Sequence, residues 1–232
     1  MNTGLPVSPS SLRGEGSHEN HEACGSVSAS ALGPEHVFRA LDEMARLGVR
    51  VWVHGGWAID AVTGTSRPHA DIDFLGNEED LPRLRQAFSS QIVEEAMHKI
   101  LFVLDGAEVE VTFFRRLSPN LYVTVTPRII ALWDPRDLGE DTATLAGRAI
   151  PVVGVRALYV SVANPVRKKA PLLEKNRRDL ERLKPFVSPE DRATASQWFP
   201  IPNTRWTRIR LSCAVAWDRC RSLLCGEGAA KK

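Results

Sequence analysis

The amino-acid sequence predicts an α/β fold, a mixed sheet with helices packed against it. The first observation is a strand-like stretch at 51–53, which the pair Gly55 and Gly56 interrupts and which continues with helical spacing. The second is a series of alternating apolar runs between residues 100 and 126, which predicts strands that extend the sheet. The third is helical periodicity before the first strand and again after residue 155, so helices flank the strand region along the chain.

Length and composition limit the classes of protein to consider. The chain has 232 residues, 43% hydrophobic and 25% charged, which suits one catalytic unit with a small second lobe. Its formal net charge of +2 is too small to indicate nucleic-acid binding by itself. No apolar run is long enough to span a bilayer, so we expect no membrane partner. The start lacks a signal-peptide pattern, and Cys213, Cys220 and Cys225 lack paired spacing, so we expect a cytoplasmic protein with free thiols.

The composition also changes along the chain. Residues 1–33 are rich in Ser, Gly, Pro, Glu and His, so we expect a disordered tail. A catalytic core is expected over 34–160 and a helical C-terminal part over 161–199. Residues 200–232 form a basic tail, in which seven Lys or Arg stand against two carboxylates. Such a tail can hold RNA or membrane phosphates by charge, or it can be an amphipathic helix packed on the domain.

The first packed element is expected at 34–48. Pro34 suits the first turn of a helix, and Gly48 ends the pattern. Apolar side chains recur on one face of this segment, at Val37, Ala40, Leu41, Met44, Ala45 and Leu47. The pattern predicts a helix that covers the sheet.

Later elements follow from the same reasoning. Asn77 is expected to cap a helix over 78–90, which Pro82 shortens or bends. Strands are expected at 100–104, 107–114, 121–126 and 147–154, and helices at 155–164, 173–186 and 188–199.

The glycine turn after the first strand suits a phosphate group. Gly55 and Gly56 let the backbone approach an anion closely, and the helix that follows offers free N–H groups and the positive end of its dipole. Trp57 and Asp60 lie just after the turn. Two interpretations of these two side chains stay open: contact with a nucleotide, or a core residue and a brace for the turn.

Two carboxylates follow on the next predicted strand. Asp71 and Asp73 are two residues apart, so both side chains point to the same face. Side by side they repel each other unless a cation holds both ionised, and hard oxygen ligands of this kind suit magnesium. Together with the glycine turn, the pair indicates a site for a metal-bound nucleotide.

These motifs carry a family resemblance. The combination of GGWAIDA, RPH and DID between 55 and 73 resembles the DNA polymerase β-type nucleotidyltransferase superfamily, and within it the aminoglycoside and lincosamide nucleotidyltransferases. The resemblance covers roughly Val49 to Glu110 and continues more loosely to about Pro185. It implies a polymerase β-like core of mixed sheet and packed helices, with a short helical C-terminal part.

The resemblance also implies roles for several residues. Gly55 and Gly56 are expected to meet the phosphates of the nucleotide, together with Arg67, whose guanidinium can neutralise phosphate charge. Lys175 begins a K-x-x-x-D-L pattern and is expected to reach the triphosphate, although its spacing to Asp179 equally suits a surface ion pair. His69, beside the two aspartates, has no assigned role beyond the possibility of orienting one of them.

A third carboxylate is expected on the strand at 107–114. Alternation sets Glu108 and Glu110 on one face, and the resemblance favours Glu110 as the residue that joins Asp71 and Asp73 in binding Mg²⁺. Relatives more often carry aspartate at that position. A pair of solvent-facing glutamates on an ordinary antiparallel strand is the alternative.

An acidic loop follows at 134–141. Its four carboxylates could form a lip for a polycationic acceptor, or they could simply face solvent, and we favour the second interpretation.

The function implied by these residues and the resemblance is transfer of AMP, or another nucleoside monophosphate, from a magnesium-bound nucleoside triphosphate. The acceptor is expected to be a hydroxyl of an aminoglycoside-like or lincosamide-like small molecule, with release of pyrophosphate and a link to antibiotic resistance. ATP is the expected co-substrate and Mg²⁺ the cofactor. The alternatives are a toxin–antitoxin-type nucleotidyltransferase acting on tRNA or a protein, for which the basic tail is the only indication, and a degenerate member without catalysis.

Overall fold

The structure is a computed structural model, and it describes residues 32–118, 120–127, 129–163, 174–195, 201–213 and 216. The α-helices are α1 (Pro34–Arg46), α2 (Gly55–Thr63), α3 (Leu81–Ala87), α4 (Val155–Ala163), α5 (Glu174–Leu183) and α6 (Pro189–Thr194). The strands are β1 (Val51–Val53), β2 (Asp71–Asn77), β3 (Ile92–Ala96), β4 (Lys99–Leu104), β5 (Ala107–Ser118), β6 (Leu121–Val125), β7 (Ile129–Trp133), β8 (Thr142–Leu145), β9 (Arg148–Pro151) and β10 (Ile201–Pro202). Short 3-10 turns follow β2, β7 and α5, and residues 205–213 are also helical.

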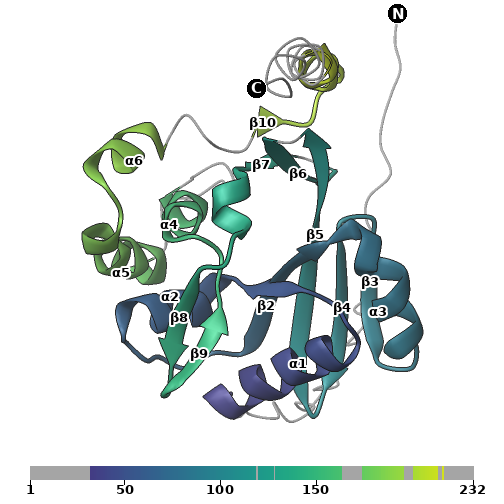
Figure 1. Ribbon diagram of the computed structural model, residues 1–232, viewed down its shortest axis with the longest axis vertical. Coiled ribbons are helices and arrows are strands. Elements are labelled where there is room, and N and C mark those ends of the chain that lie inside the picture. Colours follow the sequence, from purple (N-terminus) through teal and green to yellow (C-terminus); the bar gives the residue numbers. More distant parts are fainter. Residues whose placement is uncertain are drawn as a thin grey trace, which may run out of the picture.

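The strands form one mixed sheet and a separate hairpin, which confirms the predicted fold class. In the large sheet β1, β2, β5, β6, β7 and β10 are neighbours in that order, and β4 pairs with both β3 and β5. The β2–β5 pair is parallel, whereas the other pairs between named strands are antiparallel. β5 is long: its first half pairs with β2 and β4, and its last residues pair with β6. In Figure 1 it runs through the middle of the molecule.

The helices gather in two places around the sheet. Figure 1 shows α2, α4, α5 and α6 on the left beside the β8–β9 hairpin, and α1 and α3 at the lower right. α2 contacts β2, β8, α4 and α5, so α4 and α5 pack directly against the helix that begins at the glycine turn. α4 crosses the division that we expected at residue 160, and it joins the sheet region to the C-terminal helices.

Periodicity predicted the main helices well. The helix expected at 34–48 is α1, and its buried residues Val37, Ala40, Leu41 and Met44 belong to the predicted apolar face. The helix expected at 78–90 is divided, because Asn77 caps a 3-10 turn and Pro82 lies at the start of α3. Residues 1–31 lie outside the described residues, so the structure does not test the disordered tail.

Several strands were not predicted. β3 carries Glu94 and Glu95 and lies at the outside of the sheet, where its polar side chains remain in solvent and alternation is lost. β7 has the continuous sequence IIALW, which lacks alternation because residues on both of its faces are covered. In the basic tail, β10 pairs with β7 and a helical run follows it, so the described part of the tail adds to the fold. No described helix is long and apolar enough to cross a membrane.

Candidate active site

The carboxylates of β2 and β5 lie side by side because the two strands are parallel and in register. Asp71 pairs with Glu108, and Asp73 pairs with Glu110, so all four side chains project from the same face. Asp73 and Glu110 are partly buried and line one pocket, whereas Asp71 and Glu108 are exposed and do not line it. The register therefore gives Glu110 and Glu108 different surroundings, which the sequence alone could not do.

The glycine turn allows the side chains of Asp73 and Arg67 to approach the backbone closely. Gly55 has φ +63°, in the left-handed region, and a Cβ there would lie 2.3 Å from Asp73 Oδ2. A Cβ on Gly56 would lie 2.4 Å from Arg67 Nη2. His54 is the N-cap of α2 but makes no side-chain cap, and the first turn of the helix carries no acidic residue. The helix start thus presents backbone N–H groups between a carboxylate and a guanidinium.

Arg67 has the donors that a phosphate would require. Its Nε is buried and has no hydrogen-bond partner among the described residues. Its Nη2 lies 3.5 Å from Asp179 Oδ2, which holds the guanidinium against the glycine turn. Lys175 of α5 lines the same pocket. An unpartnered buried donor next to a backbone cradle fits an anionic oxygen.

A network around Asp60 braces the loop that carries Arg67. Asp60 is 2% exposed; its carboxylate accepts hydrogen bonds from the backbone N of Arg67 at 3.0 Å and Thr65 Oγ1 at 3.2 Å, and lies 2.8 Å from His69 Nε2. Trp57 stacks on His69 with ring centroids 4.1 Å apart and donates from Nε1 to the carbonyl of Asp71 at 3.0 Å. These contacts favour the brace over nucleotide contact for Trp57 and Asp60. His69 orients Asp60, not an aspartate of β2.

The pocket also contains Lys99, which the sequence did not indicate, and Asp179, which the sequence offered only as a surface partner of Lys175. Lys99 Nζ lies 3.0 Å from Glu110 Oε2 and 3.0 Å from Glu94 Oε2, so a cation already accompanies Glu110. Asp179 is 3% exposed and pairs with Arg67 and, at 3.9 Å, with Arg182, whereas the alternative surface pair between Asp179 and Lys175 does not form. The one sequence feature that could have indicated Lys99 is its position as the first residue of an otherwise apolar strand. Its approach to Glu110 depends on the β4–β5 register.

The pocket that these residues line has a volume of about 440 Å³. Its walls come from α2, β2, β4 and β5, from β6 and β7, and from α4 and α5. The residues from β6, β7 and the turn between them are Thr124, Thr126, Ile129, Ala131 and Trp133. Of the residues proposed from the sequence, the structure brings Gly55, Gly56, Arg67, Asp73, Glu110 and Lys175 together here and leaves Asp71 at the exposed end of β2.

The donor set fits a magnesium ion that shares its ligands with a substrate. Within the described part of the chain, no group of three or more His, Cys, Asp or Glu side chains is arranged to enclose a metal ion. Asp73 and Glu110 supply two neighbouring carboxylates, and Mg²⁺ commonly binds one or two carboxylates together with water and phosphate oxygens. The pocket therefore suits a metal that arrives with a nucleotide better than a closed structural metal site.

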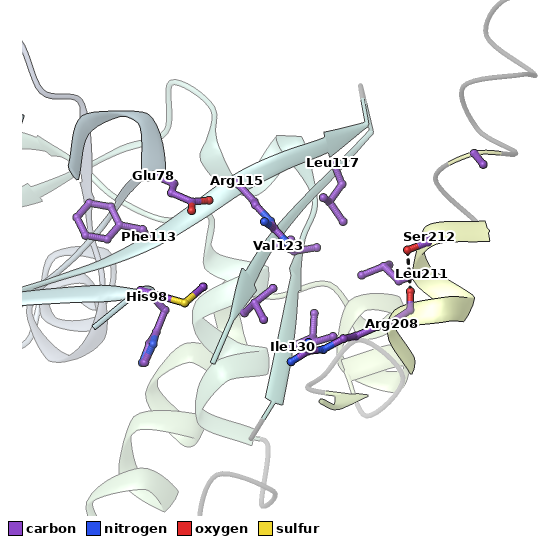
Figure 2. Close-up of a pocket in the computed structure, with 13 residues that line it drawn as sticks. Glu78, His98, Phe113, Arg115, Leu117, Val123, Ile130, Arg208, Leu211 and Ser212 are labelled. Carbon is purple, nitrogen blue, oxygen red and sulfur yellow. Dashed lines mark hydrogen bonds between the residues drawn. The ribbon is translucent and has the colours of Figure 1, made fainter. Parts of the chain in front are cut away.

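A second pocket, of about 530 Å³, lies on the opposite face of β5, β6 and β7. Figure 2 shows Val123 and Ile130 of the strands and Leu211 of the helical run 205–213 around it. Glu78 is the single carboxylate among its described lining residues. His98 lines both pockets, and burial, with the charge of Lys99 adding to it, lowers the pKa of its imidazole. The neighbouring carboxylates Asp73 and Glu110 line the 440 Å³ pocket and not this one.

The acidic loop takes part in the fold. Asp137 is 4% exposed and forms a tight ion pair with Arg156, Asp134 pairs with Arg136 at 2.8 Å, and Glu140 pairs with Arg50 at 2.8 Å. Burial raises the pKa of the Asp137 carboxyl to about 6, although Arg156 opposes this shift. None of the carboxylates of 134–141 lines the 440 Å³ pocket, so the loop forms neither an acidic lip nor a wholly solvated segment.

The mixed sheet with its packed helices is the fold of nucleotidyltransferases that modify antibiotics. The lincosamide antibiotic adenylyltransferase LnuA, solved with lincomycin bound, is 18% identical with a TM-score of 0.53, and the match covers 68% of this chain and 100% of LnuA. The antibiotic-resistance factor ANT(2'')-Ia is 17% identical with a TM-score of 0.56, and the match covers 77% and 92% of the two chains. A second structure of ANT(2'')-Ia, in complex with adenylyl-2''-tobramycin, gives a TM-score of 0.51, and the match covers 69% of this chain and 92% of ANT(2'')-Ia.

The family follows from the sequence itself. The family model described as aminoglycoside-2''-adenylyltransferase matches residues 36–168, more than half of the 232 residues, and the chain belongs to this family. It is thus an enzyme of an adenylyltransferase family, which uses a nucleoside triphosphate as co-substrate. No curated protein matches the chain significantly.

Proposed function

We propose that the protein transfers AMP from magnesium-bound ATP to a hydroxyl of an antibiotic-like small molecule and releases pyrophosphate. The observation that carries this proposal is a single pocket lined by the neighbouring carboxylates Asp73 and Glu110, by the glycine turn, and by Arg67 and Lys175. Carboxylates that bind a metal and cations that bind a triphosphate are the two requirements of nucleotidyl transfer.

Each group has a role in this reaction. Gly55 and Gly56 leave room for phosphate oxygens at the start of α2, where backbone N–H groups bind them. Arg67 Nε and Lys175 neutralise the charge of the leaving pyrophosphate. Asp73 and Glu110 would hold magnesium, with Asp71 approaching from the exposed end of β2. The metal, when bound, supplies Lewis-acid stabilisation of the charge on the phosphate oxygens.

The acceptor hydroxyl oxygen attacks the α-phosphorus of ATP, and the bond between that phosphorus and the oxygen bridging to the β-phosphorus breaks. Pyrophosphate leaves with the bonding electrons. The hydroxyl proton passes to a carboxylate oxygen of Glu110, which lines the pocket beside Thr112 and Lys99.

Mass spectrometry of acceptors incubated with ATP and magnesium tests the proposal. We expect an AMP adduct on a small hydroxyl compound and an equal amount of pyrophosphate. Asp73→Asn should abolish both with the fold intact, because it removes a metal-binding charge from a site where carboxylates repel each other. Label that appears only on tRNA or protein, or undiminished transfer by Asp73→Asn at saturating magnesium, would contradict the proposal.

A further inference from the structure

The second pocket, on the other face of β5, β6 and β7, has the size and the walls of a small-molecule site. Its volume of about 530 Å³ falls within the range of roughly 300 to 1,000 Å³ that ligand pockets occupy. Its floor is apolar, because Phe113, Val123 and Ile130 of the sheet are each at most 3% exposed. The helical run 205–213 supplies the facing side with Leu211 (Figure 2). An apolar chain bound between the sheet and this run would be shielded from water by both.

Two guanidinium groups add positive charge to these apolar walls. Arg115 extends from β5 and Arg208 from the helical run, and both line the pocket (Figure 2). Within the described part of the chain, the Arg115 side chain makes no hydrogen bond or ion pair. The Arg208 guanidinium makes one hydrogen bond there, from Nε to Asn203 Oδ1 at 2.7 Å. Both arginines therefore retain N–H donors for a ligand.

The charges of the described lining do not cancel. Glu78 is the single carboxylate among these residues, and it forms no ion pair with Arg115 or Arg208. Burial, with the charge of Lys99 adding to it, lowers the pKa of His98, so this imidazole is neutral at pH 7. Two arginines and one glutamate leave a net charge of +1 among the described lining residues. A ligand with one negative charge would balance it.

We propose that the second pocket binds a free aliphatic carboxylate, with its chain between the sheet and the helical run and with Arg115 and Arg208 as the partners of its charged group. A carboxylate carries one negative charge at neutral pH, and guanidinium groups bind it through charge-assisted hydrogen bonds. A phosphate monoester, with about 1.5 to 2 negative charges, exceeds the charge of the lining. An uncharged chain would leave the guanidinium donors without an acceptor.

This site is separate from the proposed active site. Among the described lining residues, His98 is the single one that the two pockets share. A ligand in the second pocket therefore meets neither the carboxylates Asp73 and Glu110 nor the glycine turn. The inference does not depend on the proposed adenylyl transfer.

Isothermal titration calorimetry of the full chain with decanoate and with decanol tests the inference. The two probes have chains of the same length and differ in charge. Below the micellar concentration we expect one decanoate to bind per chain, and decanol to bind more weakly by on the order of tenfold, because decanol lacks the charge that the guanidinium groups recognise.

Three substitutions identify the residues that bind the charge. Arg115→Gln and Arg208→Gln should each weaken decanoate binding by roughly tenfold, because each removes a charged donor, and should leave decanol binding unchanged. Arg205→Gln is the matched control: Arg205 is exposed on the same helical run but does not line the pocket, so its loss should not change the affinity for decanoate.

Several results would overturn the inference. The first is the absence of saturable decanoate binding, and the second is equal affinity for decanoate and decanol. An equal loss of affinity in Arg205→Gln and in the two pocket variants would mean that the general charge of the helical run is the cause. Binding that begins only at the micellar concentration would show adsorption of an aggregate in place of a single molecule. The titrations need neither ATP nor magnesium, so a failure of the proposed function leaves this inference standing.

Discussion

Glu108 and Glu110 lie two residues apart on the same face of β5, yet their surroundings differ. Glu110 stands beside Asp73, lines the pocket and has Lys99 and Thr112 as neighbours. Glu108 stands beside Asp71 in solvent. Two residues along a strand are roughly 6 to 7 Å apart, too far for both side chains to serve the same metal.

We therefore expect unequal effects of substitution. Glu110→Gln should lower turnover by on the order of a hundredfold or more with little change in ATP affinity, because a metal ligand or proton acceptor acts mainly in the transition state. Glu108→Gln should change turnover only slightly. Steady-state rates and ATP binding of both variants measure these effects. A severe loss of turnover in Glu108→Gln together with normal turnover in Glu110→Gln would show that Glu108, and not Glu110, serves the site.

Lys99 should limit metal binding at Glu110. Its ammonium group neutralises Glu110 and so competes with any metal for that carboxylate. Lys99→Gln should bind Mn²⁺ more tightly in the absence of nucleotide, by roughly tenfold, as one unit charge is removed from the site. Electron paramagnetic resonance titration with Mn²⁺ measures this. Lys184→Gln, which removes an exposed lysine paired with Glu181, is the control, and an unchanged or weaker affinity in Lys99→Gln would show that Lys99 does not compete.

Among the elements, the segment between α2 and β2 depends on one buried carboxylate. Asp60 fixes the backbone of Arg67 and the ring of His69, and thereby the guanidinium that faces the glycine turn. Asp60→Ala should reduce the free energy of unfolding by about 2 to 4 kcal/mol, because it leaves buried donors without an acceptor, and should weaken ATP binding as Arg67 is released. Asp60→Asn, which keeps one acceptor oxygen, should cost less. Denaturant unfolding and ATP titration measure the two effects. Unchanged ATP affinity in Asp60→Ala would show that ATP binding does not depend on the Asp60 network.

The loop between β7 and β8 should respond to pH. The carboxyl of Asp137 has its pKa raised from 3.8 to about 6 by burial, so between these values the unfolded chain releases the proton and the folded protein keeps it. Stability relative to Asp137→Asn should then be greatest below about pH 4 and fall as pH rises through 6, by at most about 3 kcal/mol. Chemical denaturation of both proteins at several pH values provides the measurement. A difference that is constant with pH would mean that Arg156 keeps the pKa near its ordinary value.

At the scale of the whole molecule, a large part of the fold was predictable and the assembly of the site was not. Local signals such as the glycine pair, the Asp71 and Asp73 alternation and the apolar face of α1 depend on neighbours in the sequence, and each was interpreted correctly as structure. The pairing of Asp73 with Glu110 depends on the register of two parallel strands separated by β3 and β4. The partners of Lys99 and Asp179 are also distant along the chain. The sequence could therefore indicate candidate residues but not which of them lie in contact.

One further prediction concerns residues 1–31, which lie outside the described part of the chain. The sequence there has neither apolar periodicity nor a motif of the family, and the first described contact is the backbone N–H of Leu32 donating to the carbonyl of His69 at 3.0 Å. Deletion of Met1 to Ala31 should leave turnover and the melting temperature unchanged. Loss of ATP binding in the truncated protein would show that the segment contributes to the site.

The divided pairing of β5 has a consequence for how new specificities arise. The first half of β5 pairs with β2 and β4 and contains Glu110. Its last residues pair with β6 of the β6–β7 hairpin, which lines the same pocket. A recombination breakpoint just after Phe114 would therefore replace the hairpin as a cassette while Asp73 and Glu110 keep their register. Exchange of that cassette between related chains would change one wall of the pocket and leave the carboxylates in place, so the same breakpoint suits the construction of chimaeras.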